Sequence, residues 1–282
     1  MNIAPEILNY LSERREFAEV ILAPKASPVE RRGKSVRKIM DVVLSTEDIR
    51  DTLVSLRSHT PVSLGPLGRE GFFSFGIPDV GRIRVTYLTQ RGSYVVSIVK
   101  VPYEIPPLKD IVANYSDAKK LFEALNTDTG IVPIIGKSFV THNLFSYSLL
   151  REVCSRESGL VYILERPLTY LIKHDVSIVI QREVGVDVES FEKGIEEALF
   201  VHPEIIYISD ITTKDGLNAL RKLFDIPILT LISVTASNLE ALRSSLEALS
   251  DGRGTEIVRR INRVIELELE DDDRISFSLR DI

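Results

Sequence analysis

The chain has 282 residues, of which 44% are hydrophobic and 27% charged, which is typical of a globular protein with room for two domains. Its formal net charge of -6 argues against non-specific nucleic-acid binding, which needs an excess of basic residues. No apolar stretch reaches the roughly 18 residues of a membrane-spanning helix, and the first residues lack the order of a signal peptide. A single cysteine, Cys154, excludes an internal disulfide. We therefore expect a cytoplasmic protein with a buried structural thiol.

The first part of the chain predicts an α+β domain. The basic segment 31–38 is interpreted as a solvated strand edge or loop, with a patch for an acidic partner as the alternative, and we expect a strand in MDVVLS (40–45). Ser45 and Asp48 form a capping pair for a helix over 45–58. Apolar and polar residues then alternate in segments that indicate an antiparallel sheet with one solvated face: 71–77, 81–89 and 93–100.

Beyond a proline-containing connector at 101–111, the pattern changes to alternating strands and helices. Nearly continuous apolar runs predict the strands of a parallel sheet buried on both faces: 130–136, 159–165, 176–181, 204–209 and 227–232. Helical spacing runs from Val188 through Phe191 to Leu199, and Ser237 and Glu240 predict a capping box for a later helix. The tail predicts a β-hairpin across an acidic turn at 271–273.

Two stretches carry a resemblance to a known family. GRIRVTYLTQRGS (81–93), followed by EIPPLKDI (104–111), and QREVGVDVESFEKGIEEALFVHPEIIYISD (181–210) resemble the PilT-like twitching-motility, pilus-retraction ATPases of the secretion-ATPase group. The resemblance spans roughly residues 45–250, and residues 1–44 match only loosely. It implies a PAS-like α+β domain over 1–112, a RecA-like α/β domain of the P-loop type over 113–282, and a six-membered ring.

The family's nucleotide loop, GxTGSGKST, falls on GKSFVTHNL (136–144). Such a loop needs small residues whose N–H groups close around phosphates, a lysine for the terminal phosphates and a hydroxyl for magnesium. Gly136 is retained, Thr141 lies in the tight part of the loop, and His142 and Asn143 occupy the lysine and hydroxyl positions. We interpret the loop as degenerate, and we expect catalysis to be lost because phosphoryl transfer depends on positioning and charge.

The remaining catalytic elements are altered as well. The acidic box, IEDPIEF in the family, falls on LERPLTY, which keeps Glu165. The segment that ends in GEMRD in the family ends in SDITT here and places Asp210 at the catalytic glutamate position, while Ser233 stands at the family's histidine position. Glu165 and Asp210 are therefore the residual catalytic candidates. Their structural alternatives are a local charge pair with Arg166 and a turn or cap residue; for His142 the alternative is a helix-start residue that caps or faces solvent.

Four arginines are candidates for a subunit interface. Arg82, Arg84 and Arg91 lie in the best-matched strand pair, which in the family packs against the next subunit. Arg182 matches a family arginine that faces the neighbouring subunit's nucleotide. A solvated basic face is the alternative for the strand pair.

These features together predict a non-catalytic PilT-like protein that serves as an assembly, regulatory or structural partner in type IV pilus or secretion machinery. We expect self-association or a mixed ring with a PilT-like ATPase, contact with inner-membrane components without membrane insertion, and no cofactor or metal. Two alternatives stay open. One is a working retraction motor that hydrolyses ATP with magnesium, and the other is a sensor that binds a different small ligand in the remodelled pocket.

Overall fold

The computed structural model describes residues 1–14, 17–32, 35–60, 65–127, 129–209, 211, 213–250, 254–271 and 273–282. The chain divides into an N-terminal unit, Met1–Glu104, and a C-terminal unit, Ile105–Ile282. The division falls inside the expected connector, before the boundary that we predicted after residue 112. Among the described residues, no helix is both long and apolar enough to cross a bilayer.

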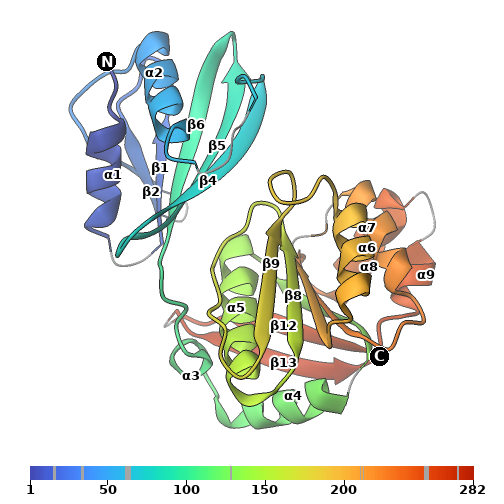
Figure 1. Cartoon of the computed structure of the whole chain (residues 1–282). Coiled ribbons are helices and arrows are strands. Elements are labelled where there is room, and N and C mark those ends of the chain that lie inside the picture. The colour runs from blue at the N-terminus through green and yellow to red at the C-terminus, as the bar shows by residue number, and fades with distance from the viewer. Residues whose placement is uncertain are drawn as a thin grey trace. The chain divides into compact units, whose positions relative to one another are not determined.

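The N-terminal unit is an antiparallel sheet of order β3-β2-β1-β6-β5-β4, with α1 and α2 against one face (Figure 1). Buried apolar side chains from the helices and from alternate strand positions form its core. The predicted cap of α2 is confirmed, because Ser45 accepts from the Asp48 N–H and Asp48 from the Ser45 N–H. Its elements are α1 (Ala4–Ser12), β1 (Ala18–Leu22), β2 (Val29–Arg32), β3 (Ser35–Lys38), α2 (Thr46–Arg57), β4 (Glu70–Ile77), β5 (Gly81–Gln90) and β6 (Ser93–Val101).

One prediction for this unit is wrong: residues 40–45 form no strand. Their backbone is instead fixed by two hydrogen bonds, from the Leu44 N–H to the Ala26 carbonyl and from the Lys25 N–H to the Leu44 carbonyl. Leu44 is buried while Val43 points to solvent. The basic segment supplies β2 and the exposed edge strand β3, as expected of a solvated edge.

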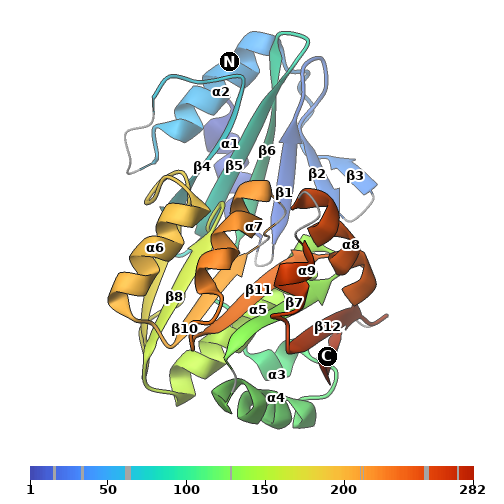
Figure 2. The same cartoon turned by 90° about the vertical axis from the view of Figure 1, so that its right-hand side faces the viewer.

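The C-terminal unit is built on a sheet of order β13-β12-β7-β11-β10-β8-β9, parallel except for the β12–β13 hairpin. Figure 1 shows α5 on one face and α6, α7 and α8 on the other, and Figure 2 shows the strands behind those helices. Its elements are α3 (Leu108–Ile111), α4 (Ser116–Thr127), β7 (Gly130–Gly136), α5 (Phe139–Arg156), β8 (Leu160–Glu165), β9 (Ile178–Glu183), α6 (Phe191–Val201), β10 (Ile205–Ser209), α7 (Lys214–Leu220), a 3-10 turn (Arg221–Leu223), β11 (Leu229–Thr235), α8 (Leu239–Leu249), α9 (Gly254–Val258), β12 (Arg263–Leu269) and β13 (Ile275–Asp281).

The predicted parallel sheet and terminal hairpin are confirmed, with two corrections at helix starts. Val188 precedes α6, whose N-cap is Ser190, and bridges Val184 from within the core. The cap of α8 is Asn238, which accepts from the Ala241 N–H, so the capping box expected from Ser237 is wrong. The Cys154 thiol is buried as predicted, and burial raises its pKa to about 12.

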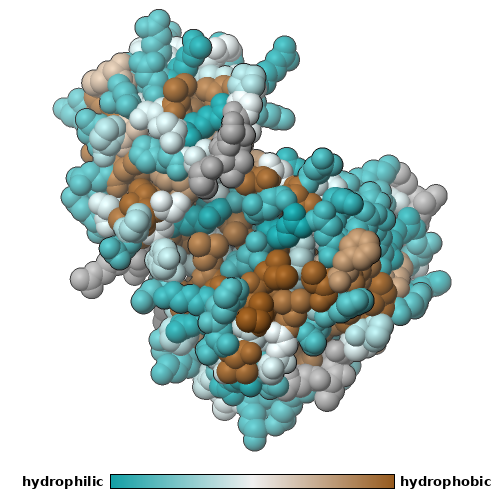
Figure 3. Space-filling model, viewed as in Figure 1, coloured by the Kyte–Doolittle hydropathy of each residue, from teal (hydrophilic) through white to brown (hydrophobic). Residues whose placement is uncertain are grey.

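Side chains from the same unit bind backbone donors of the edge strand β9. Its Val179 N–H donates to Nδ1 of His174 at 3.1 Å, and its Glu183 N–H donates to Oδ2 of Asp187 at 2.8 Å. The Gln181 side chain binds backbone groups of segment 170–172. Figure 3 shows apolar side chains gathered over this part of the unit, where Leu171, Val176 and Ile178 are exposed. Because two of its backbone donors are occupied, this edge is a poorer template for the addition of another strand than a bare edge.

Candidate functional site

The candidate site lies where β7 ends and α5 begins. β7 ends at Gly136 and α5 starts at Phe139, so only Lys137 and Ser138 link them. Thr141, His142 and Asn143 therefore belong to the first helical turns. We had expected Thr141 and Asn143 in a loop, and a helix-start position for His142 was the alternative that we considered. The exposed Lys137 ammonium pairs with Glu268 of β12 at 3.1 Å.

Ser138 starts the helix early because it is an effective N-cap. Its Oγ accepts from the Thr141 N–H at 3.1 Å, and its carbonyl accepts from the His142 N–H at 3.2 Å. The Thr141 hydroxyl also bonds Ser138 Oγ, at 2.8 Å. The backbone N–H groups of Thr141 and His142 lie at positions that bind phosphates in the family's loop. Here both donate to Ser138 and are therefore already hydrogen-bonded at the start of the helix.

His142 is buried, which corrects the expectation of a capping or solvent-facing side chain. It has no exposed surface, and its Nε2 lies 2.9 Å from the Thr235 hydroxyl. The ring packs edge-on against Phe139, and a Cβ placed on Gly136 would lie 3.0 Å from the Cβ of His142. Burial lowers the pKa of His142 to about 4. The imidazole is therefore neutral at pH 7 and supplies no charge to an anion.

Asn143 and Glu165 are joined inside the C-terminal unit. Asn143 Nδ2 donates to Oε1 of Glu165 at 2.8 Å, and both side chains are buried. Glu165 also accepts from the Tyr147 hydroxyl at 2.6 Å, and from the N–H and hydroxyl of Thr169, each at 2.7 Å. The local pair with Arg166 that we considered is therefore not what holds this carboxylate. Four neutral donors solvate it in place of water.

Aromatic rings close over this carboxylate from neighbouring elements. Tyr147 packs against Tyr170 and Tyr207 at ring distances of 5.2 and 5.7 Å. The Tyr207 hydroxyl donates to Ser233, the residue at the family's histidine position, at 3.0 Å. Burial, reinforced by the charge of Glu165, raises the pKa of Tyr170 to about 12 and that of Tyr207 further. We call Asn143, Tyr147, Glu165, Thr169, Tyr170, Tyr207 and Ser233 the Glu165 network.

Sequence reasoning named Asn143, Glu165 and Ser233 singly, but it missed the tyrosines. Tyr147 follows Asn143 by one helical turn, a spacing that places both on one face of α5 and that the sequence displays. Tyr207 faces α5 because strand residues alternate between sheet faces. No group of three or more His, Cys, Asp or Glu side chains arranged to hold a metal occurs among the residues that the structure describes.

The remaining predicted residues are spread over both units. Arg82 and Arg84 lie on the face of β5 opposite the buried Ile83 and Val85, and Arg82 donates to Ser74 Oγ at 2.6 Å. Arg91 takes a positive φ of 51° in the β5–β6 turn, next to Gly92.

Two predicted residues belong to the C-terminal unit. The guanidinium of Arg182 pairs with Glu197 of α6 and donates to the Asp187 carbonyl. Asp210 lies outside the described residues, so its expected catalytic or capping role stays a prediction.

Known proteins resemble this chain at low identity. No family model matches it. The type IV pilus ATPase PilU of Pseudomonas aeruginosa is 22% identical over 205 residues, which cover 71% of this chain and 52% of PilU. A twitching motility protein of Neisseria gonorrhoeae is 21% identical over 187 residues, which cover 66% of this chain and 48% of that protein. The chain thus spans about half the length of the curated relatives it matches.

Solved structures match the fold over nearly the whole chain. The crystal structure of the pilus retraction motor PilT with bound ADP matches with a TM-score of 0.74 and 19% identity, covering 100% of this chain and 83% of that one. The ATPase DotB of Legionella pneumophila matches with a TM-score of 0.71 and 17% identity, covering 99% and 81%. The fold is therefore that of the pilus and secretion ATPases. The sequence similarity to PilU and to the twitching motility protein agrees with the resemblance of the two stretches to PilT-like proteins.

Proposed function

We propose that this chain is a non-catalytic PilT-like protein, a cytoplasmic assembly, regulatory or structural partner in type IV pilus or secretion machinery. The observation that carries the proposal is the buried hydrogen bond between Asn143 and Glu165. It joins the position of the magnesium-binding hydroxyl to the retained acid of the acidic box. The proposed partners are further copies of this chain, a PilT-like ATPase in a mixed ring, and inner-membrane components of the machine.

As folded, these residues do not fit ATP with magnesium. The Asn143 amide and the Glu165 carboxylate are engaged with each other, and Glu165 accepts three further hydrogen bonds. Entry of phosphates would require unwinding the first turn of α5, and losing its Ser138 cap alone costs about 1 kcal/mol. The neutral His142 would not compensate, because a charged hydrogen bond to phosphate contributes about 1.5–3 kcal/mol.

Thermal unfolding with and without ATP and magnesium tests the proposal. A ligand at 100 times its Kd stabilises the folded state by about 2.7 kcal/mol, so a working motor requires a clear rise in Tm. We expect the wild-type Tm to be unchanged at millimolar ATP. A rise would overturn the proposal in favour of the motor.

A variant with the family's loop chemistry is the matched control. It combines Phe139→Gly, Val140→Ser, Thr141→Gly, His142→Lys and Asn143→Ser. Small residues free the backbone N–H groups, and the lysine and serine restore the phosphate and magnesium contacts. We expect this variant to gain a Tm shift with ATP and magnesium that the wild type lacks.

A further inference from the structure

A pocket lies at the end of the C-terminal sheet opposite to the Glu165 network. The pocket, of about 440 Å³, opens where β7 and β11 begin, and Gly130, Ile131 and Pro227 are among the residues that line it. β7 separates this pocket from Ser138, and its seven residues span about 20 Å. A volume in this range is typical of small-molecule sites. The pocket is therefore independent of the Glu165 network.

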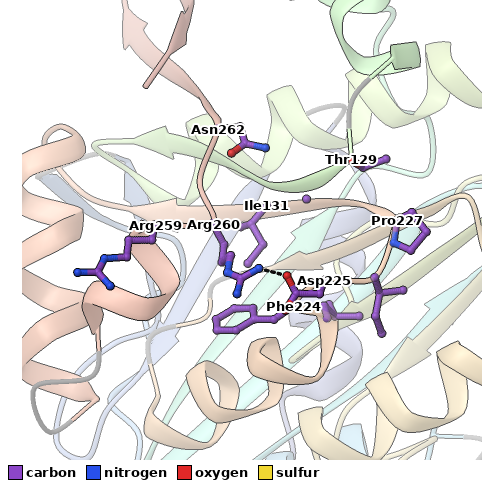
Figure 4. Close-up of a pocket in the computed structure, with 11 residues that line it drawn as sticks. Thr129, Ile131, Phe224, Asp225, Pro227, Arg259, Arg260 and Asn262 are labelled. Carbon is purple, nitrogen blue, oxygen red and sulfur yellow. Dashed lines mark hydrogen bonds and ion pairs between the residues drawn. The ribbon is translucent and has the colours of Figure 1, made fainter.

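The walls of the pocket combine an apolar floor with a basic rim. We call the apolar lining residues Ile131, Leu223, Phe224, Ile226 and Pro227 the floor, and the polar lining residues Arg259, Arg260 and Asn262 the rim. Figure 4 shows Asn262 on one side of the pocket, Phe224 and Asp225 on the other, and Ile131 between them. This pairing of apolar floor and cationic rim suits a ligand with an apolar body and an anionic end.

Arg260 is positioned to receive that anionic end. Its guanidinium carbon lies 5.3 Å from the centre of the Phe224 ring, and the guanidinium pairs with the carboxylate of Asp225 (Figure 4). Contact with the ring orients the planar guanidinium and leaves its N–H edge to bind an oxyanion. Arg259 adds a second positive charge, and its guanidinium has no partner among the described residues.

The ion pair between Asp225 and Arg260 is weak. Both side chains of the pair are largely exposed, and exposed ion pairs contribute little because water solvates both charges. Asp225 reaches the pocket from a left-handed backbone conformation with φ 62°. The pocket therefore contains an internal carboxylate that an external anion can replace.

We propose that this pocket binds a small organic anion, with its carboxylate or phosphate on Arg260 in place of Asp225 and its apolar part on the floor. The proposal goes beyond the proposed function, because binding here does not depend on whether nucleotide binds at α5.

Titration of the isotope-labelled full chain, followed by amide NMR shifts, tests this inference. Benzoate and phenyl phosphate are the probes and distinguish a carboxylate from a phosphate, while benzyl alcohol and inorganic phosphate lack one of the two required parts. We expect saturable shifts at Gly130, Ile131 and Asn262 with at least one aromatic anion at millimolar concentration. Shifts confined to 137–143, or no saturable shifts at the pocket with either aromatic anion, would overturn the proposal.

Two substitutions with opposite expected effects sharpen the test. Arg260→Gln should weaken binding of the aromatic anion at least about tenfold, because a charged hydrogen bond is lost. Asp225→Asn should tighten it about two- to fivefold, because the internal competitor is removed. Arg280→Gln, an exposed arginine paired with Glu266, is the control and should bind as wild type. Unchanged or weaker binding by Asp225→Asn contradicts displacement and overturns the proposal.

Discussion

His142 couples the stability of the C-terminal unit to pH. Its pKa is lowered from 6.5 to about 4 by burial, so below pH 6.5 the unfolded chain binds a proton that the folded chain rejects. Above pH 6.5 the imidazole is neutral in both states, so its titration does not lower the free energy of unfolding. As the pH falls from 6.5 to 4, protonation of the unfolded chain lowers this free energy by roughly 3 kcal/mol. Urea unfolding across this pH range measures the loss.

The control for this prediction is His142→Gln, which does not titrate and keeps a hydrogen-bonding group for Thr235. The difference in unfolding free energy between wild type and variant isolates the histidine from carboxylates that titrate nearby. If both proteins lost stability in parallel between pH 6.5 and 4, His142 would not be the group responsible.

Glu165 is the residue on which the buried polar network depends. Glu165→Gln keeps the shape but replaces one acceptor oxygen with an NH2 group. At the Oε1 position this group would face the donors of Asn143 and the Thr169 hydroxyl, and at the Oε2 position those of the Tyr147 hydroxyl and the Thr169 N–H. We expect a loss of about 2–4 kcal/mol in unfolding free energy, since buried donors are left unpaired. Glu268→Gln, which breaks the exposed pair with Lys137, should cost less than about 1 kcal/mol. Equal stability of the two variants would refute the role of Glu165.

At the scale of elements, the sequence predicted those whose pattern is local. The strands of the C-terminal sheet are long apolar runs, and β4–β6 alternate clearly, so both sets were found. For β2 and β3 the sequence left a strand edge and a loop both open, because VERR and SVRK are short and polar and are held in the sheet by pairing with β1 and with each other. The Glu165 network was missed for a related reason. It joins α5, β8, β10 and β11 through a strand order that the sequence does not display.

The start of α5 shows how one cap changes a site. The family pattern predicted a loop through Asn143, but Ser138 offers a side-chain acceptor three residues before Thr141, and helix formation prevailed. Ser138→Ala should therefore destabilise the C-terminal unit by about 1 kcal/mol, whereas Ser138→Gly should cost only a few tenths, because glycine is tolerated at an N-cap. Denaturant midpoints of the two variants measure this. Equal losses would mean that the Ser138 side chain does not cap α5.

At the scale of the whole molecule, the two units differ in what they retain of the family pattern. The N-terminal unit keeps the GRIRV strand and the QRGS turn, where Arg91 and Gly92 both take the positive φ that a two-residue hairpin turn requires. The C-terminal unit keeps the sheet but fills its carboxyl edge with the Glu165 network. Association through the arginine-bearing face of β5 does not need a nucleotide, so we expect oligomerisation to persist without one.

Light scattering of the purified chain tests that expectation, in the presence and absence of ATP. We expect a mass above the monomer that grows with concentration, and a shift toward monomer in Arg82→Glu/Arg84→Glu, because charge reversal on one face of β5 repels the surface it contacts. Arg50→Glu, on α2 across the core from that face, is the control and should associate as wild type. Unfolding curves of each variant separate lost association from lost folding, which matters because Arg82 also bonds Ser74. A strictly monomeric wild type at every concentration, alone and with a PilT-like ATPase, would leave the β5 arginines as a solvated face and remove the ring from the proposed function.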